Sequence, residues 1–163
     1  MAVQSDYRYS LTVNGTTQFE VVRFVLKEHL SALFRLELDL ASFGSEPNFH
    51  SLIDHPATLT FWQGNETIRS VNGIITALNQ GETGFTRTRY HMVIEPSLCR
   101  AGLQTDLRIF QQQDSQKIIE TLLSKNQVSQ SQFHLQTPYW TREYCVQYLS
   151  LIHISEPTRR RGI

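Results

Sequence analysis

Strict alternation of apolar and polar residues is the feature of this sequence that most restricts its fold. It is clearest over residues 34–40, where every second residue is Phe or Leu and the residues between are Arg35, Glu37 and Asp39. Successive side chains of a β-strand point to opposite faces of a sheet, so a period of two indicates a strand with one buried and one solvated face. A helix, with its period of 3.6, would spread these apolar side chains around its circumference.

The same alternation recurs through the first hundred residues and predicts a series of strands separated by turns. Asn14-Gly15 is a strong hairpin signal because both residues tolerate positive φ, and residues 44–48, 63–66 and 81–84 are typical of loops and turns. Residues 49–54 fit one helical turn. We expect strands over residues 7–13, 19–26, 34–42, 57–62, 67–78 (interrupted by Gly73) and 85–95.

After Pro96 the pattern changes. We expect a short helix at 96–103, strands at 107–111, 133–135 and 144–148, and an amphipathic helix at 115–126. Asp114 or Ser115 can cap that helix by accepting a backbone N–H. One apolar stripe on it is predicted to pack on a sheet: Ile118, Ile119, Leu122 and Leu123. The fold class is therefore mainly β, with one α-helix near 115–126 and short helical turns.

Composition excludes several classes of function. The chain has 15 Lys and Arg against 15 Asp and Glu, so its formal net charge is zero and it lacks a basic surface for nucleic acid or anionic membranes. Its longest apolar runs are too short to span a bilayer, and its first six residues do not resemble a signal peptide. Cys99 and Cys145 form no CxxC pattern, which argues against a disulfide scaffold or a zinc site.

Residues 149–163 differ in composition from the rest of the chain. Without them the chain has 12 basic and 14 acidic residues, a net charge of −2. Residues 151–159 resemble translated sequencing-adapter sequence, so we expect a non-native tail; the alternative is a basic binding or targeting tail built on Arg159, Arg160 and Arg161.

No pattern in the chain predicts a catalytic, cofactor-binding or metal site. There is no HExxH, no GxSxG and no glycine-rich phosphate loop. Cys145 lies in an expected strand and is interpreted as a structural thiol. The histidines of the body are interpreted as scattered surface residues: His29, His50, His55, His91 and His134. The candidate interface residues, equally well explained as solvated surface, are Arg35, Glu37 and Asp39 on one strand and Arg87 and Arg89 on another.

The order of the motifs nevertheless resembles one family. It is similar to the N-terminal region of the VgrG spike proteins of bacterial type VI secretion systems and to phage baseplate hub and late control proteins, over most of residues 7 to 148. Any single motif is weak, and their order and spacing carry the resemblance. The matching segments are Phe19–Phe24, Glu28–Phe34, Pro56–Leu59, Val71–Ile74, Tyr90–Leu98, Asp106–Gln111, Ile118-Ile119 and Arg142–Tyr148.

The resemblance implies a phage tail hub fold of two small β-barrels whose strands are interleaved in sequence. Residues 1–105 would form most of the first barrel and residues 106–148 would begin the second, incomplete one. In the family a Glu-Ser-Asp-like segment follows Tyr148, and residues 149–163 do not fit it. We therefore expect a truncated or mis-assembled reading frame that lacks the family's needle and any effector domain.

The resemblance also implies a function. We expect a structural, non-enzymatic spike base, without cofactor, that trimerises, docks on the hexameric Hcp tube and is driven through a target envelope, touching membranes only mechanically. Effectors or a PAAR-type tip protein would bind through the missing part. The protein would assemble in the bacterial cytoplasm and then be exported by the machinery. One alternative is a phage or prophage tail baseplate hub; a distant one is a small ligand-binding or hydrolytic barrel that uses His50, His55 and Cys145.

Overall fold

The fold is described from a computed structural model, which defines residues 7–16, 19–43, 48–103, 107–128, 131–134 and 140–148. The chain divides into two compact units, Met1–Pro96 and Ser97–Ile163. The predicted extents of the two barrels, 1–105 and 106–148, are a different division and stay a prediction. Residues 149–163, expected to be non-native, lie outside the described residues. No helix of the described segments is long and apolar enough to cross a bilayer.

The first unit is one antiparallel sheet of six strands in the order β1-β4-β5-β6-β3-β2. This confirms the mainly β prediction, and the observed bounds lie close to the expected ones. A capped 3-10 helix, η2 (Phe49–Ser51), stands where one helical turn was expected. The strands are β1 (Tyr7–Val13), β2 (Glu20–Lys27), β3 (Arg35–Ser42), β4 (Pro56–Gln63), β5 (Glu66–Thr83) and β6 (Thr88–Glu95).

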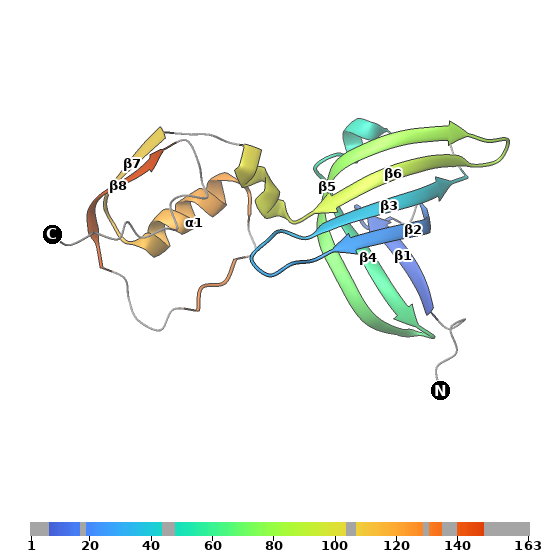
Figure 1. Cartoon of the computed structure of the whole chain (residues 1–163), viewed down its shortest axis with the longest axis horizontal. Helices are drawn as coiled ribbons and strands as arrows, with labels where there is room; N and C mark the ends of the chain where they lie inside the picture. Colours follow the sequence, from blue (N-terminus) through green and yellow to red (C-terminus); the bar gives the residue numbers. More distant parts are fainter. Residues whose placement is uncertain are drawn as a thin grey trace. The chain divides into compact units, whose positions relative to one another are not determined.

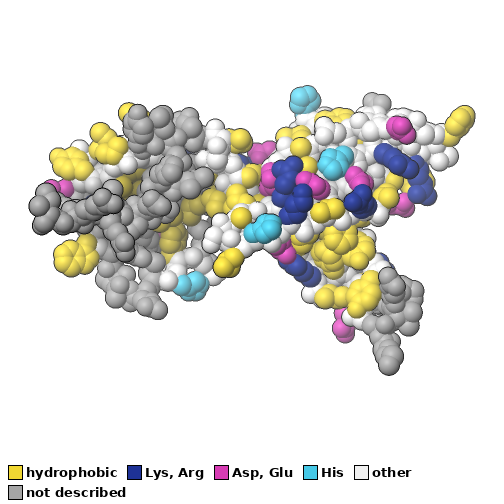
Figure 2. Space-filling view, in the orientation of Figure 1, with side chains coloured by type: hydrophobic (Ala, Val, Ile, Leu, Met, Phe, Trp, Pro, Cys, Tyr) yellow, Lys and Arg dark blue, Asp and Glu magenta, His cyan; other side chains and the backbone are white. Residues whose placement is uncertain are grey.

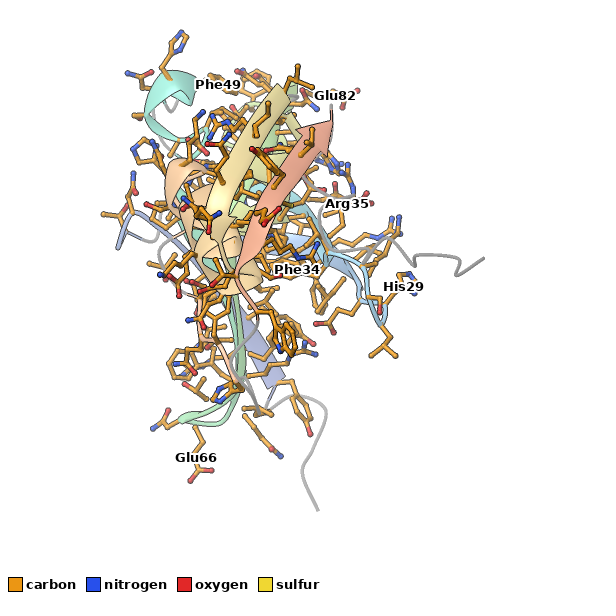
Figure 3. The ribbon with its side chains drawn as sticks, turned by 90° about the vertical axis from the view of Figure 1, so that its left-hand side faces the viewer. His29, Phe34, Arg35, Phe49, Glu66 and Glu82 are labelled. Atoms are coloured by element: carbon orange, nitrogen blue, oxygen red, sulfur yellow. The ribbon has the colours of Figure 1, made fainter. Side chains whose placement is uncertain are left out.

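The sheet curls into a half-barrel because β5 is shared by both of its halves (Figure 1). The first part of β5 pairs with β4, up to Pro56↔Ile74, and the second part pairs with β6 from Ile74↔Glu95 onward. Glu66 and Glu82, near the two ends of β5, lie at opposite ends of the unit (Figure 3). The two ends of the strand order, β1 and β2, therefore approach each other on one side of the curled sheet.

The concave side of this sheet holds the core. The alternation that predicted β3 is confirmed, since Leu36, Leu38 and Leu40 are buried while Arg35 and Asp39 are exposed. Full burial of each such side chain contributes about 1.5–3 kcal/mol relative to an exposed one. Neighbouring strands supply the other large side chains of the core, among them Leu11, Leu59, Ile75, Tyr90, Met92 and Ile94.

The second unit contains a two-stranded sheet and the one α-helix of the described residues. The antiparallel strands β7 (Leu107–Gln113) and β8 (Arg142–Tyr148) form the sheet, and α1 (Ser115–Lys125) lies between them in sequence. The 3-10 helix η3 (Ser97–Leu103) stands where a short helix was expected. Phe110 of β7 packs on α1 with Cys145 of β8 beside it.

Four sequence predictions are wrong in detail. Asn14-Gly15 forms the expected tight turn between Val13 and Thr16, but β1 then pairs with β4 and β2 with β3, so the two strands that flank the turn do not form a hairpin. The turn expected at 81–84 lies at 84–87, because an irregularity in pairing between Gln80 and Thr83 lets β5 continue to Thr83. The strand expected over 85–95 begins at Thr88 for the same reason. The strand expected at 133–135 is absent from the described residues 131–134, because a run of two or three residues does not specify a pairing partner, and Leu135 lies outside them.

The apolar stripe of α1 is narrower than predicted. Ile118 and Leu122, one turn apart, are buried, whereas Ile119 is 37% exposed at the edge of the stripe. The described part of the sheet, β7 and β8, buries the side of the helix that carries Ile118 and Leu122, with Phe110 and Cys145 packed against it. The predicted cap is present, since Asp114 accepts a hydrogen bond from the Lys117 backbone N–H at 2.8 Å.

Candidate functional site

The residues named for a hydrolytic site belong to two different units of the chain. His50 and His55 are exposed in the first unit, and the His55 ring contacts only its own turn, with Nδ1 3.0 Å from the Ile53 carbonyl oxygen. Cys145 belongs to the second unit, where it packs against the α1 cluster. His29 and His134 are exposed as well. Within the described segments, no three His, Cys, Asp or Glu side chains come together as a metal site would require.

The convex face of β2, β3 and β6 carries the first candidate interface residues. Arg35 Nε lies 2.9 Å from Glu37 Oε1, and Arg35 Nη1 lies 3.0 Å from Glu95 Oε1. Lys27 Nζ is 3.7 Å from the other oxygen of Glu37. Basic and acidic side chains are therefore interleaved over this face (Figure 2). We call these four residues the convex charge network.

The electrostatics of this network follow from the guanidinium of Arg35. Its hydrogen bond to Glu37 lowers the pKa of that carboxyl below its usual range, and the charge of Lys27 lowers it further. The same hydrogen bond raises the pKa of Arg35, against a smaller opposing effect of desolvation. The network satisfies its own charges, so it offers no unpaired charge to a substrate.

Asp39, Arg87 and Arg89 complete the predicted surface residues. Asp39 Oδ1 lies 2.9 Å from His91 Nδ1 on the same convex face. Arg87 stacks 4.0 Å from the centre of the Phe43 ring and lies 3.5 Å from Glu20. Arg89 is exposed on β6, opposite Ala41 in the register. These residues lie on one face with the convex charge network, which extends the polar surface along the sheet.

The approach of β1 and β2 forms a second surface, the β1–β2 seam, filled by three aromatic rings. The rings of Tyr9, Phe24 and Phe61 meet edge to face, with centroids 4.9 to 5.4 Å apart. Arg69 and Glu28 form an ion pair within the same unit. In Figure 2 hydrophobic side chains gather below the charged face. The seam is closed by side chains, because β1 and β2 are not neighbours in the hydrogen-bonded strand order.

A third surface is the outer face of the two-stranded sheet. It is built from Leu107 and Ile109 of β7 and Tyr144 and Val146 of β8, which are 57 to 67% exposed. Ile109 and Val146 stand opposite each other in the register, so the four side chains form one patch. The opposite face of the sheet carries Phe110 against α1. We call these four residues the β7–β8 outer face.

Sequence reasoning predicted both strands of this sheet but missed the outer face. The available signal was the alternation within each strand. Leu107 and Ile109 share one face of their strand and Phe110 lies on the other. In the same way, Tyr144 and Val146 share one face and Cys145 lies on the other. When a strand is apolar on both faces, the sequence pattern does not predict which face a helix will cover. The three surfaces are thus built of ion pairs, of packed aromatic rings and of exposed apolar side chains.

Comparison with known proteins identifies the family of the chain. The family of phage tail baseplate hub (GPD) proteins matches residues 27–149. The type VI secretion spike protein VgrG2a of Pseudomonas aeruginosa is 39% identical over 145 residues, 88% of this chain and 17% of that protein. VgrG3 of Vibrio cholerae is 36% identical over 71% of this chain and 11% of its own length. The chain thus spans a fifth or less of these relatives.

Solved structures share the fold. The E. coli c3393 protein, described as a type VI secretion component similar to the T4 bacteriophage tail proteins gp27 and gp5, has a TM-score of 0.72 at 23% identity. The match covers 86% of this chain and 39% of that one. A 43 kDa tail protein of prophage MuSo2 from Shewanella oneidensis has a TM-score of 0.54 at 10% identity, over 83% of this chain and 42% of that one.

Proposed function

This chain belongs to the phage tail baseplate hub (GPD) family, and we propose that it serves as the spike-base segment of a type VI secretion machine. The observation that carries the proposal is its 39% identity to a type VI secretion spike protein over 88% of its length. The proposed role is structural rather than enzymatic: three copies assemble, dock on the hexameric Hcp tube and transmit its motion.

The mechanism we propose is mechanical. When the sheath contracts, the moving tube pushes the spike base, and the spike passes through the target envelope. Such a part must resist load, which suits a curled sheet whose six strands are joined by backbone hydrogen bonds. It must also present surfaces that other subunits can cover, and the convex charge network and the β7–β8 outer face are of this kind.

The proposed partners and location follow from the same role. Hcp is the tube partner, and effectors or a PAAR-type tip protein would be carried by the additional length that the relatives have. The protein would assemble in the bacterial cytoplasm and leave with the machinery. It would meet a membrane only when pushed through it, and the balanced charge of the chain gives nucleic acid no basic surface.

A second candidate is a phage or prophage baseplate hub, which is favoured by the family description and by the prophage tail protein of the same fold. Capture on immobilised rings separates the two functions. The chain is passed over Hcp hexamers and over phage tail tube rings from the same source, with a β-barrel protein of similar size as control. Retention on Hcp alone supports secretion, and retention on the tail tube alone supports a phage hub. Retention on neither contradicts both.

A further inference from the structure

We propose that Asn14 is a site of spontaneous deamidation, at which a cyclic succinimide forms and the side-chain amide becomes a carboxylate. The tripeptide Val-Asn-Gly occurs twice in the chain, at residues 13–15 and 71–73. Glycine favours this reaction because it has no side chain to hinder attack by its backbone nitrogen. The two tripeptides share this local chemistry, so the difference between them lies in the fold.

The reaction uses water as its only added reactant and oxidises or reduces no atom. The backbone nitrogen of the glycine attacks Cγ of the asparagine and gives up its proton, and the side-chain nitrogen leaves as ammonia. Water then opens the ring at one of the two carbonyl carbons bonded to the glycine nitrogen, which takes back a proton. Opening at Cγ gives aspartate, whereas opening at the main-chain carbonyl carbon gives isoaspartate, in which Cβ becomes part of the backbone.

The first tripeptide lies in an exposed tight turn, in which φ is 49° at Asn14 and 76° at Gly15. Two backbone hydrogen bonds close the turn, from the Val13 N–H to the Thr16 carbonyl oxygen at 2.8 Å and in the reverse direction at 2.9 Å. Neither uses the Gly15 N–H, which donates to no backbone carbonyl of the described residues. The attacking nitrogen is therefore open to solvent and can lose its proton there.

The second tripeptide is held in the interior of the six-stranded sheet. Asn72 belongs to β5, which lies between β4 and β6 in the strand order. Its side-chain Oδ1 accepts a hydrogen bond from Thr58 Oγ1 at 2.8 Å. Gly73 stands opposite Ala57, and its backbone lies against that of Glu95. The ring can close here only if β5 first separates from its neighbours.

The free energy of local opening therefore decides which asparagine reacts. Ring closure needs a rotation about ψ of the asparagine that brings the glycine nitrogen to Cγ. Exposed turns open at a small cost, whereas interior strands open only when much of the unit unfolds. Conversion at Asn14 places a negative charge in the turn and removes the donor of its hydrogen bond to the Ser51 carbonyl oxygen, 3.4 Å from Asn14 Nδ2. The turn then loses its side-chain contact with η2.

The test follows both tripeptides in one sample of the full chain, kept folded at neutral pH and, in parallel, unfolded in urea. Trypsin releases Asn14 within residues 9–23 and Asn72 within residues 70–87, and fragment masses assign the converted residue. In the folded chain Asn14 should convert at least about tenfold faster than Asn72. In urea the two rates should be alike. Chromatography should separate aspartate and isoaspartate forms of the Asn14 peptide.

Gly15→Asp is the matched control variant. Aspartate tolerates positive φ better than most residues, and a Cβ added at Gly15 meets no atom within 4 Å. Its side chain hinders the attacking nitrogen, so conversion at Asn14 should slow while Asn72 keeps its rate. Equal rates at the two sites in the folded chain overturn the proposal, as does an Asn14 that converts only in urea. A preference for Asn14 that persists in urea, or aspartate formed without isoaspartate, also overturns it.

Discussion

Gly73 lies where the pairing of β5 passes from β4 to β6, and its backbone comes close to β6. It stands where β5 leaves β4, opposite Ala57, one residue before β5 begins to pair with β6. A Cβ atom added here would lie 2.5 Å from the Glu95 carbonyl oxygen and 2.7 Å from Ile94 Cγ2. Both distances are shorter than van der Waals contact, so only glycine, which has no Cβ atom, permits the two backbones to come this close.

Gly73→Ala should therefore destabilise the first unit by about 1–3 kcal/mol, as overpacking does in other cores. Gly81→Ala in the same strand is the control, because its added Cβ would meet Arg89 at an ordinary 3.6 Å. Urea unfolding of both variants measures the difference in the free energy of unfolding. Equal urea midpoints for Gly73→Ala and Gly81→Ala would contradict the close approach of the backbones at Gly73.

Gln147 is the least satisfied polar residue of the second unit among those described. Its side chain is 1% exposed, and neither amide atom has a hydrogen-bond partner among the described residues. An unpaired buried amide costs about 1–3 kcal/mol. Gln147→Met, of similar length, should therefore raise the hydrogen-exchange protection of the β7–β8 amides, while exposed Gln111→Met should leave it unchanged. Lower protection in Gln147→Met would mean that the amide is paired in solution.

At the scale of elements, α1 depends on its first turn. Asp114 accepts from the Lys117 N–H at 2.8 Å, and loss of such a cap costs about 0.5–2 kcal/mol. Asp114→Ala should reduce the helicity of α1 and the hydrogen-exchange protection of its first turn. Asp114→Asn keeps a side-chain oxygen that can accept the hydrogen bond, and it should therefore retain most of that protection. If both variants lose protection equally, the carboxylate charge stabilises the helix rather than the cap.

The convex charge network predicts a dependence on pH. Hydrogen bonding from Arg35 lowers the pKa of Glu37 in the folded protein, so the carboxylate stabilises the fold above the ordinary glutamate pKa. This contribution disappears as pH falls through the lowered value. A carboxyl titration by NMR should give a pKa for Glu37 below the ordinary range of glutamate. The substitution Arg35→Gln should raise that pKa. An unchanged titration in Arg35→Gln would show that the hydrogen bond is absent in solution.

Local pattern was enough to predict most elements. The alternation in β3 and the cap of α1 were predictable because each is set by residues adjacent in sequence. The end of β5 was not, because Gly81 is typical of a turn and only pairing with β6 keeps it in the strand. The β1–β2 seam was also missed, since Tyr9, Phe24 and Phe61 meet only after the sheet curls.

At the scale of the whole molecule, the family and the charged convex face were predictable, and the β7–β8 outer face was not. The motifs from Phe19 to Tyr148 follow the order found in the hub family, and the family match over residues 27–149 confirms that resemblance. No motif marks the β7–β8 outer face, because its exposure depends on which side of the sheet α1 covers.

Sedimentation velocity of the chain mixed with Hcp hexamers tests the central claim most directly. The account predicts one boundary whose mass corresponds to three chains on one hexamer, in addition to any excess of either component. Separate boundaries for the chain and the hexamer at micromolar concentrations would contradict the proposed spike-base function.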